Sequence, residues 1–270
     1  MSSPASMEEI DWNAIYRREL AASGFARKSA EEWSRRAGIM ADRWSSDSDY
    51  VRDFAGRMNL DGCASMLDVG CGTGDLLLFL APRLEKLYGI DFSPGMLERA
   101  EKKIREKGAT NISLERLSWT DDWSSLPPVD IVTASRSFSV ADARDALSRM
   151  HRQASRRVYM TYLAGGSFLD ESILSALGRR AAPRPDYIIL VNILHQMGIR
   201  ASVDFIPGPS DSIVSPSLDD LVRRVTWSLG SIDEREECAL ALYYDTLPRV
   251  EAGALLPRAR REWAWIAWEK

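Results

Sequence analysis

Residues 1–60 have a helical pattern of apolar positions and contain few strand formers. Trp12 and Tyr16 lie four residues apart, on one face of a predicted helix. A second helix is predicted to begin after Ser29, because Ser29 and Glu32 have the spacing of a capping box. The first sixty residues are therefore expected to form a helical N-terminal cap or lid.

From residue 65 the pattern changes to short apolar strands that alternate with helices. The helices are predicted over residues 76–84, 94–107 and 141–153. The strands are predicted over residues 66–69, 87–90, 112–114, 129–134 and 158–163. Strands that alternate with helices pair in parallel, so this pattern predicts an α/β sheet.

Two later strands differ in their faces. Residues 201–206 alternate, with Val203 and Phe205 opposite two polar residues, as expected of an edge strand with one wet face. Residues 263–268 are apolar on both faces, so this last strand is expected inside the sheet. The prediction is a Rossmann-like, doubly wound, seven-stranded mixed sheet whose last strand is antiparallel and inserted. The sheet domain would span residues 61–270, with helical insertions at about 165–198 and 216–250.

Composition narrows the class of protein. The chain has 270 residues, 35 Lys+Arg against 39 Asp+Glu and a net charge of -4. No block of five like charges occurs, so a nucleic acid is a poor candidate partner. Three cysteines without a CxxC spacing encode neither a disulfide framework nor a zinc site. No signal sequence and no apolar run of about 18 residues is present, so we expect a cytoplasmic protein without a membrane span.

A glycine-rich turn follows the first predicted strand. Residues 67–75 read Leu-Asp-Val-Gly-Cys-Gly-Thr-Gly-Asp. Glycines at a strand end let the chain turn tightly and let a ligand approach the backbone beside a helix N-terminus. A dinucleotide site would need a third glycine where Asp75 stands, and an acidic side chain there would repel a pyrophosphate. No Walker GK[ST] sequence follows.

The stretch from Asp68 to Gly74 resembles motif I of class I S-adenosylmethionine-dependent methyltransferases, over roughly residues 66–163. The likeness is to the small-molecule branch that includes quinone-biosynthesis enzymes. It implies S-adenosylmethionine as cofactor, S-adenosylhomocysteine as product and a small-molecule methyl acceptor. It also implies an acidic residue at the end of the second strand, and Asp91 stands there. Asp91 would accept two hydrogen bonds from the ribose hydroxyls, unless it is a solvated helix N-cap.

The resemblance carries further residues into the expected cofactor site. Trp119 could stack on the adenine or pack in the core, and Cys71 has the properties of a small packing residue. The pair Ser118 and Trp119 departs from the family pattern, which has an acidic residue here. The N-terminal aromatic residues, Trp33 and Trp44 among them, resemble a lid, or they simply pack between helices. The complete expected set is Trp33, Asp68, Gly70, Cys71, Gly72, Gly74, Asp91, Phe92, Met96, Ser118, Trp119 and Ser135.

Methyl transfer is an in-line displacement, in which a general base is optional. Three residues are candidates for the catalytic end. Arg136 follows the fourth strand and either faces the acceptor or lies on the surface. Tyr162 ends the fifth strand and either borders the ligand crevice or packs in the core. His195 belongs to a polar stripe on an apolar helix, which faces either solvent or a pocket.

Two other functions remain open from the sequence. One is an NAD-dependent oxidoreductase on a similar sheet, which Asp75 opposes. The other is a non-catalytic module that binds the nucleoside. No metal site and no oligomer is indicated, although the apolar helix near residues 188–194 could be a subunit contact.

Overall fold

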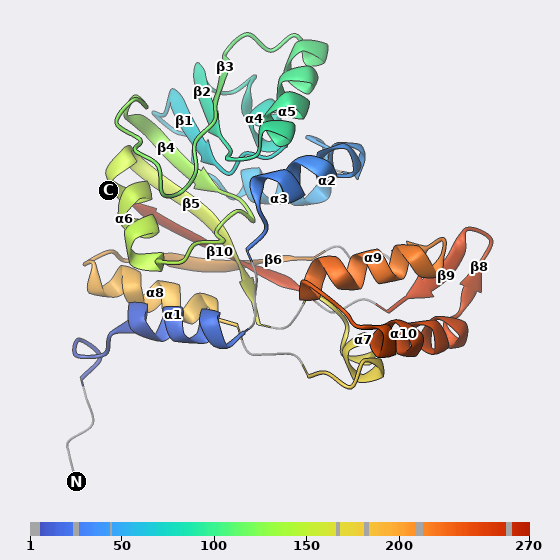
Figure 1. Cartoon of the computed structure of the whole chain (residues 1–270). Helices are drawn as coiled ribbons and strands as arrows, with labels where there is room; N and C mark the ends of the chain where they lie inside the picture. The colour runs from blue at the N-terminus through green and yellow to red at the C-terminus, as the bar shows by residue number, and fades with distance from the viewer. Residues whose placement is uncertain are drawn as a thin grey trace.

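The computed structural model describes residues 6–23, 27–43, 45–165, 168–180, 184–208, 213–257 and 261–270 (Figure 1). Trp44 lies outside these residues. The remaining aromatic residues of the predicted lid are described.

Three helices precede the sheet, as the pattern predicts. They are α1 (Trp12–Ala22), α2 (Ala30–Arg43) and α3 (Asp49–Gly56). The predicted capping box at the start of α2 is present. The Glu32 backbone N–H donates to Ser29 Oγ at 3.2 Å, and the Ser29 N–H donates to the Glu32 carboxylate at 2.8 Å.

The central sheet has the predicted seven strands in the order β3-β2-β1-β4-β5-β10-β6. Strands β1 to β5 are parallel, and β10 is antiparallel to both β5 and β6. The late insertion of an apolar strand inside the sheet is confirmed. The strands are β1 (Ser65–Val69), β2 (Lys86–Ile90), β3 (Ile112–Glu115), β4 (Val129–Ala134), β5 (Ala154–Ala164), β6 (Ser202–Pro207) and β10 (Glu262–Glu269).

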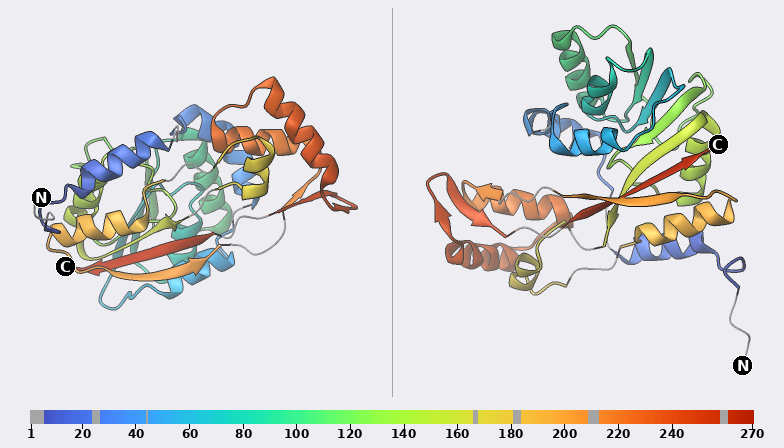
Figure 2. Two further views of the ribbon diagram at one scale, coloured as in Figure 1. Left: turned by 90° about the horizontal axis from the view of Figure 1, so that it is seen from below. Right: turned by 180° about the vertical axis from the view of Figure 1, so that it is seen from behind.

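Helices cover both faces of this sheet (Figures 1 and 2). The side chains of β1 alternate between them: Met66 packs with α3, α4 (Asp75–Leu80) and α5 (Pro94–Lys107). Leu67 and Val69 point to the other face and pack with α1, α6 (Ala143–Gln153) and α8 (Tyr187–Gln196). Both faces are buried, as expected of parallel strands.

The edge strand β6 differs from the prediction. Its position at the sheet edge is confirmed, but Val203 and Phe205 are 36% and 38% exposed. The buried residue of β6 is Ile206, which has the parity of the polar residues in the strand. The prediction of an apolar inner face at Val203 and Phe205 is wrong, because the side chain of β6 that packs in the core with α3 is Ile206.

The C-terminal third builds a second, smaller body, which we call the appendage. It consists of α7 (Glu171–Ala176), α9 (Leu218–Leu229), α10 (Glu234–Thr246) and a three-stranded sheet in the order β7-β9-β8. Leu174, Leu221 and Leu240 belong to its own buried core. Its strands are β7 (Ile213–Ser215), β8 (Arg249–Val250) and β9 (Gly253–Leu256).

The appendage projects from one end of the sheet in Figures 1 and 2. Helices α7 and α8 both come from the first predicted insertion, yet α7 packs in the appendage while α8 covers the central sheet. Helix α7 of the first insertion therefore shares a core with the second insertion. Among the described residues, no helix is both long and apolar enough to cross a membrane.

Candidate active site

A cavity of about 1180 Å³ lies at the carboxyl ends of the parallel strands. Its walls come from the turns after β1, β2 and β4, from α2 and α3, and from the side of the appendage that faces the sheet. The carboxyl ends of parallel strands are the usual place for a ligand crevice in such sheets. The cavity therefore lies beside the strand ends where the sequence analysis placed most of the candidate site residues.

The turn after β1 requires glycine at position 70. Gly70 has φ +71°, and a Cβ atom there would lie 2.4 Å from the Cβ of Ser137. Ser137 belongs to the turn after β4 and donates a hydrogen bond from Oγ to the Val69 carbonyl. The missing side chain thus lets two turns of the cavity floor lie against each other.

Asp91 holds the turn after β1 in place. Its carboxylate accepts hydrogen bonds from the Gly72 N–H at 2.9 Å and from the Ser93 N–H at 2.8 Å. Helix α5 is capped by Ser93, whose Oγ accepts from the Met96 N–H, so the reading of Asp91 as a helix N-cap is wrong. Asp91 is buried, and this burial raises the pKa of its carboxyl despite the two backbone donors.

Asp68 is a second buried carboxyl in the floor. It accepts a hydrogen bond from Thr133 Oγ1 at 2.8 Å. Burial raises the pKa of Asp68 to about 7, and the neighbouring charge of Asp91 acts in the same direction. Two buried acids with raised pKa values form a site that a positive charge would stabilise.

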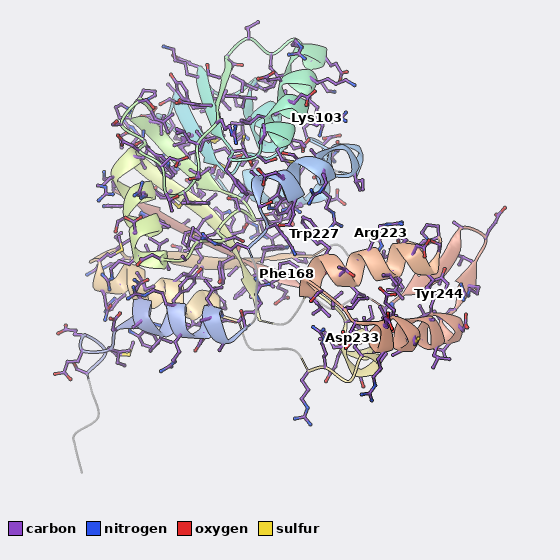
Figure 3. All side chains as sticks on the ribbon, viewed as in Figure 1. Lys103, Phe168, Arg223, Trp227, Asp233 and Tyr244 are labelled. Atoms are coloured by element: carbon purple, nitrogen blue, oxygen red, sulfur yellow. The ribbon has the colours of Figure 1, made fainter. Side chains whose placement is uncertain are left out.

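This floor has the wrong charge for a pyrophosphate. Asp68, Asp75 and Asp91 all line it, whereas none of its described lining residues between positions 68 and 96 is a lysine or arginine. Lys103 of α5, labelled in Figure 3, pairs with Asp75 at 2.8 Å without lining the cavity. The floor fits a nucleoside that carries cationic groups.

The turn after β3 supplies an aromatic wall. Trp119 lines the cavity, donates from Nε1 to the Ser137 carbonyl at 3.1 Å and meets the ring of Phe138 edge-on at 5.3 Å. It is therefore both packed and available to a ligand. The other expected cofactor residues that line the cavity are Trp33, Gly70, Cys71, Gly72, Phe92, Met96, Ser118 and Ser135.

Comparison with known proteins agrees with this geometry. The family model for the methyltransferase domain matches residues 66–156. An uncharacterized protein of Haemophilus influenzae is 32% identical over 262 residues, which are 96% of this chain and 97% of that protein. The demethylmenaquinone methyltransferase of Geobacillus stearothermophilus is 38% identical over 68 residues, which are 24% of this chain and 29% of that enzyme.

A solved structure from Bacillus halodurans, described provisionally as a methyltransferase, shares the fold at 13% identity. Its TM-score is 0.58, and the match covers 83% of this chain and 99% of that one. The chain belongs to the class I S-adenosylmethionine-dependent methyltransferases. The cofactor of this methyltransferase is accordingly S-adenosylmethionine. This assignment leaves the NAD-dependent alternative without support.

Gly74 is an expected cofactor residue of the methyltransferase that does not line the cavity. It is the N-cap of α4 with φ +77°, and a Cβ atom there would lie 3.2 Å from the Cβ of Ala100 in α5. Gly74 therefore allows a left-handed turn and the close packing of two helices.

Arg136 and a residue that the sequence did not single out, Tyr50, meet at the end of β4. The guanidinium carbon of Arg136 lies 3.9 Å from the centre of the Tyr50 ring. The Tyr50 hydroxyl is hydrogen-bonded to Ser135 at 3.0 Å and to Thr161 at 2.8 Å. Tyr50 belongs to no motif, and only the docking of α3 brings it to the strand ends. Among the described residues, Arg136 is the one non-glycine with a positive φ, at 56°.

Tyr162 lines the cavity beside Tyr16. Burial raises the pKa of the Tyr162 phenol, and its polar contact with Tyr16 offsets this only in part. The phenol therefore stays protonated near neutral pH, where it can donate a hydrogen bond but cannot accept a proton as a general base.

His195 does not line the cavity of the methyltransferase. It is exposed in the last turn of α8. Its neighbour in the polar stripe, Gln196, donates to the Ile10 carbonyl at 2.8 Å and so ties α8 to the N-terminal segment. The expectation of a catalytic His195 is corrected accordingly, because α8 covers the sheet face behind the cavity.

Proposed function

We propose that the methyltransferase transfers a methyl group from S-adenosylmethionine to a small organic molecule by in-line displacement in this cavity. The observation that carries the proposal is the acidic floor, in which two buried carboxylates lie beside a turn of bare backbone at Gly70 and Gly72. A cationic nucleoside complements that floor in both charge and shape.

The proposed cofactor contacts follow from the donors and acceptors of the floor. Each Asp91 oxygen already accepts one backbone N–H and has a further acceptor position for a ribose hydroxyl. Asp68 would face the ammonium group of the cofactor. Phe92, Met96 and Trp119 offer apolar surfaces for the adenine, with Ser118 at the edge of the base. Cys71 lines this floor as a neutral thiol, because burial raises its pKa.

The bound cofactor supplies an electrophilic methyl carbon on a positively charged sulfur. The remaining work of the chain is to align the acceptor and to exclude water. Neither catalytic candidate that lines the cavity can take up a proton: Tyr162 is a protonated phenol, and an arginine has no acceptor atom. We therefore infer that the acceptor reacts through an atom that is already ionised or carries a free lone pair.

Helix α2 of the helical cap lies against the proposed site. Ser34 of α2 accepts a hydrogen bond from the Gly95 N–H at 3.1 Å, and its Oγ is hydrogen-bonded to Ser93 Oγ at 2.9 Å. Trp33 on the same helix lines the cavity. These contacts join the lid to the first turn of α5, directly after Asp91.

A cytoplasmic location is part of the proposal. All three cysteines, Cys63, Cys71 and Cys238, are free thiols, as is usual for a reducing compartment. The small-molecule acceptor is supported by the cavity of about 1180 Å³ and by a net charge of -4, which disfavours a polyanionic nucleic acid.

Thermal unfolding with added ligand tests the proposal. S-adenosylhomocysteine at 100 times its dissociation constant should stabilise the fold by about 2.7 kcal/mol, which raises the midpoint on the order of 5 °C. NAD at the same concentration should leave the midpoint unchanged. A rise of the midpoint with NAD alone would contradict the proposal, and so would an unchanged midpoint with both ligands.

A further inference from the structure

The part of the cavity that faces the appendage has a wall of aromatic rings. The ring centre of Tyr50 lies 6.4 Å from that of Trp263, and the Trp263 ring lies 6.4 Å from that of Phe168. All three residues line the cavity, and they come from α3, β10 and the segment before α7. We call this part the acceptor chamber. Neighbouring rings are inclined by 69° and 51°, so the row offers both ring faces and ring edges to an aromatic ligand.

Guanidinium groups stand at both ends of this row. Arg136 lies over the Tyr50 ring at one end. At the other end, the guanidinium carbons of Arg184 and Arg261 lie 5.1 Å and 5.6 Å from the centre of the Phe168 ring. Arg261 also donates a hydrogen bond to the Phe168 carbonyl at 2.6 Å, which fixes its position. Two arginines therefore converge on one side chain, which Figure 3 labels near the junction of the sheet and the appendage.

The carboxylates of the same region have structural roles. Asp170 caps α7 by accepting from the Ser172 N–H, and Asp186 caps α8 while accepting from the Gly165 N–H at 2.8 Å. Of the seven arginines and lysines among the described lining residues, none comes from the acidic floor. Three of the five lining aspartates, by contrast, belong to that floor. Charge is thus separated within one cavity.

Arg184 is partly buried, and this burial lowers the pKa of its guanidinium. Guanidinium groups bind carboxylates and phosphates through paired hydrogen bonds, so an organic anion is the ligand that this end of the chamber fits.

We propose that the methyl acceptor is an aromatic organic anion whose carboxylate or phosphate is held by Arg184 and Arg261 while its ring system packs among Phe168, Trp263 and Tyr50. The inference rests on the proposed function and gives the acceptor its chemical class. Arg136 stands at the opposite end of the rings, next to Ser135 and the cofactor floor. It would lie beside the reacting atom and favour the ionised form of that atom.

Calorimetric titration with matched aromatic probes tests this inference. The methyltransferase is first saturated with S-adenosylhomocysteine and then titrated with 1-naphthoate, 1-naphthyl phosphate and the neutral 1-naphthamide. At least one anionic probe should bind about tenfold more tightly than the amide, since hydrogen bonds to charged groups are the stronger class. The tighter of the two anions identifies the group as a carboxylate or a phosphate.

Two variants locate the anion. Arg184→Gln and Arg261→Gln should each weaken binding of the preferred anion about tenfold, with no change in naphthamide binding. The matched control is Arg223→Gln on α9, labelled in Figure 3, whose side chain is exposed and does not line the cavity. It should leave all three titrations unchanged. Arg261→Gln loses a contact with Phe168 and could be less stable. In that case the result for Arg184→Gln decides the test.

The outcomes separate the inference from the proposed function. Equal affinities for the anions and the amide, in protein that binds S-adenosylhomocysteine, would overturn the inference alone. The same holds if Arg223→Gln weakens the anion as much as Arg184→Gln does. Failure of S-adenosylhomocysteine itself to bind would instead contradict the proposed function.

Discussion

The floor and the acceptor chamber of one cavity have opposite electrostatic character. The floor, at the ends of β1 and β2, presents Asp68, Asp75 and Asp91. The chamber, between the sheet and the appendage, presents Arg136, Arg184 and Arg261 along a row of rings. A cationic donor on the floor and an anionic acceptor in the chamber would attract each other across the site. Under the proposed function, this methyltransferase would sort its two ligands by charge.

The two regions also differ in how the chain builds them. Most of the floor comes from a single stretch, residues 68–96, in which strand, turn and helix follow one another. The chamber is assembled from α3, the turn after β4, the segments around 168 and 184, and the start of β10. Among the ligands, changes to the floor should therefore act mainly on the cofactor, and changes to the chamber mainly on the acceptor.

The largest effect is expected for Asp91→Ala. Loss of two charge-assisted hydrogen bonds to the ribose should weaken S-adenosylhomocysteine binding about 100-fold or more, measured by calorimetry. The variant also leaves the Gly72 and Ser93 N–H groups without their acceptor. Its free energy of unfolding should therefore fall by about 1–3 kcal/mol in the absence of ligand.

The two effects of Asp91→Ala are separable. Calorimetry at low temperature, where both proteins are folded, compares the dissociation constants directly. A variant that is destabilised but binds S-adenosylhomocysteine as the parent does would show that Asp91 only supports the turn, and the floor would then lose its proposed role.

The pH dependence of binding comes next in size. The pKa of Asp68 in the folded protein, about 7, lies above its value in the unfolded chain. Folding without ligand therefore favours the protonated carboxyl, and the free energy of unfolding falls as the pH rises toward 7. A bound ammonium favours the ionised form. S-adenosylhomocysteine affinity should therefore rise about five- to tenfold from pH 6 to pH 7.5, by calorimetry.

Asp68→Asn is the control for this dependence. It should bind more weakly and flatten the pH profile, with only the smaller contribution of Asp91 remaining. An affinity that falls with pH in the parent protein would contradict the assignment of a cationic group to the floor.

A smaller effect is expected where the lid meets the floor. A Cβ atom at Gly95 would lie 2.8 Å from the Cα of Ser34, so Gly95→Ala must displace α2. Overpacking of this kind costs about 1–3 kcal/mol, and S-adenosylhomocysteine binding should weaken a few-fold as the lid moves. Gly56→Ala is the matched control, since nothing lies within 4 Å of its added Cβ. The control should unfold at the same midpoint or higher. Equal effects of both substitutions would remove α2 from the site.

The smallest effect on the cofactor is expected for Trp227→Ala. The Trp227 ring, labelled in Figure 3, joins α9 to α2 by meeting Trp33 edge-on at 5.2 Å and Arg36 at 4.1 Å. Its loss should cost about 1 kcal/mol of stability and speed proteolysis at the appendage. S-adenosylhomocysteine affinity should stay within about twofold, because Trp227 belongs to the chamber side. A loss as large as that of Gly95→Ala would show that floor and chamber are not separate.

Local patterns predicted the floor and most of the sheet. Three signals are carried by neighbouring residues: the alternation of strands and helices, the glycine-rich turn, and the two apolar faces of residues 263–268. They correctly predict β1, β2 and the inserted β10. Asp91 was singled out by the family resemblance, and its hydrogen bond from the Gly72 N–H was not predicted.

The features that the sequence did not predict depend on long-range packing. Strands β7 and β8 have three and two residues, too few for a periodic signal. Tyr50 belongs to no motif, and only the docking of α3 brings its hydroxyl to Ser135 and Thr161. For His195, the polar stripe is visible in the local sequence. The side of the sheet that α8 covers is set by long-range packing, and the sequence does not show it. Side-chain periodicity shows which residues share one face of a helix or strand, but it does not show what that face contacts.

A crystal structure of the methyltransferase with S-adenosylhomocysteine tests the central claim most directly. The ribose hydroxyls should lie within hydrogen-bond distance of the Asp91 carboxylate, and the ammonium should lie beside Asp68 above the turn at Gly70 and Gly72. A nucleoside bound elsewhere in the molecule, or an Asp91 side chain turned away from the ribose, would contradict it.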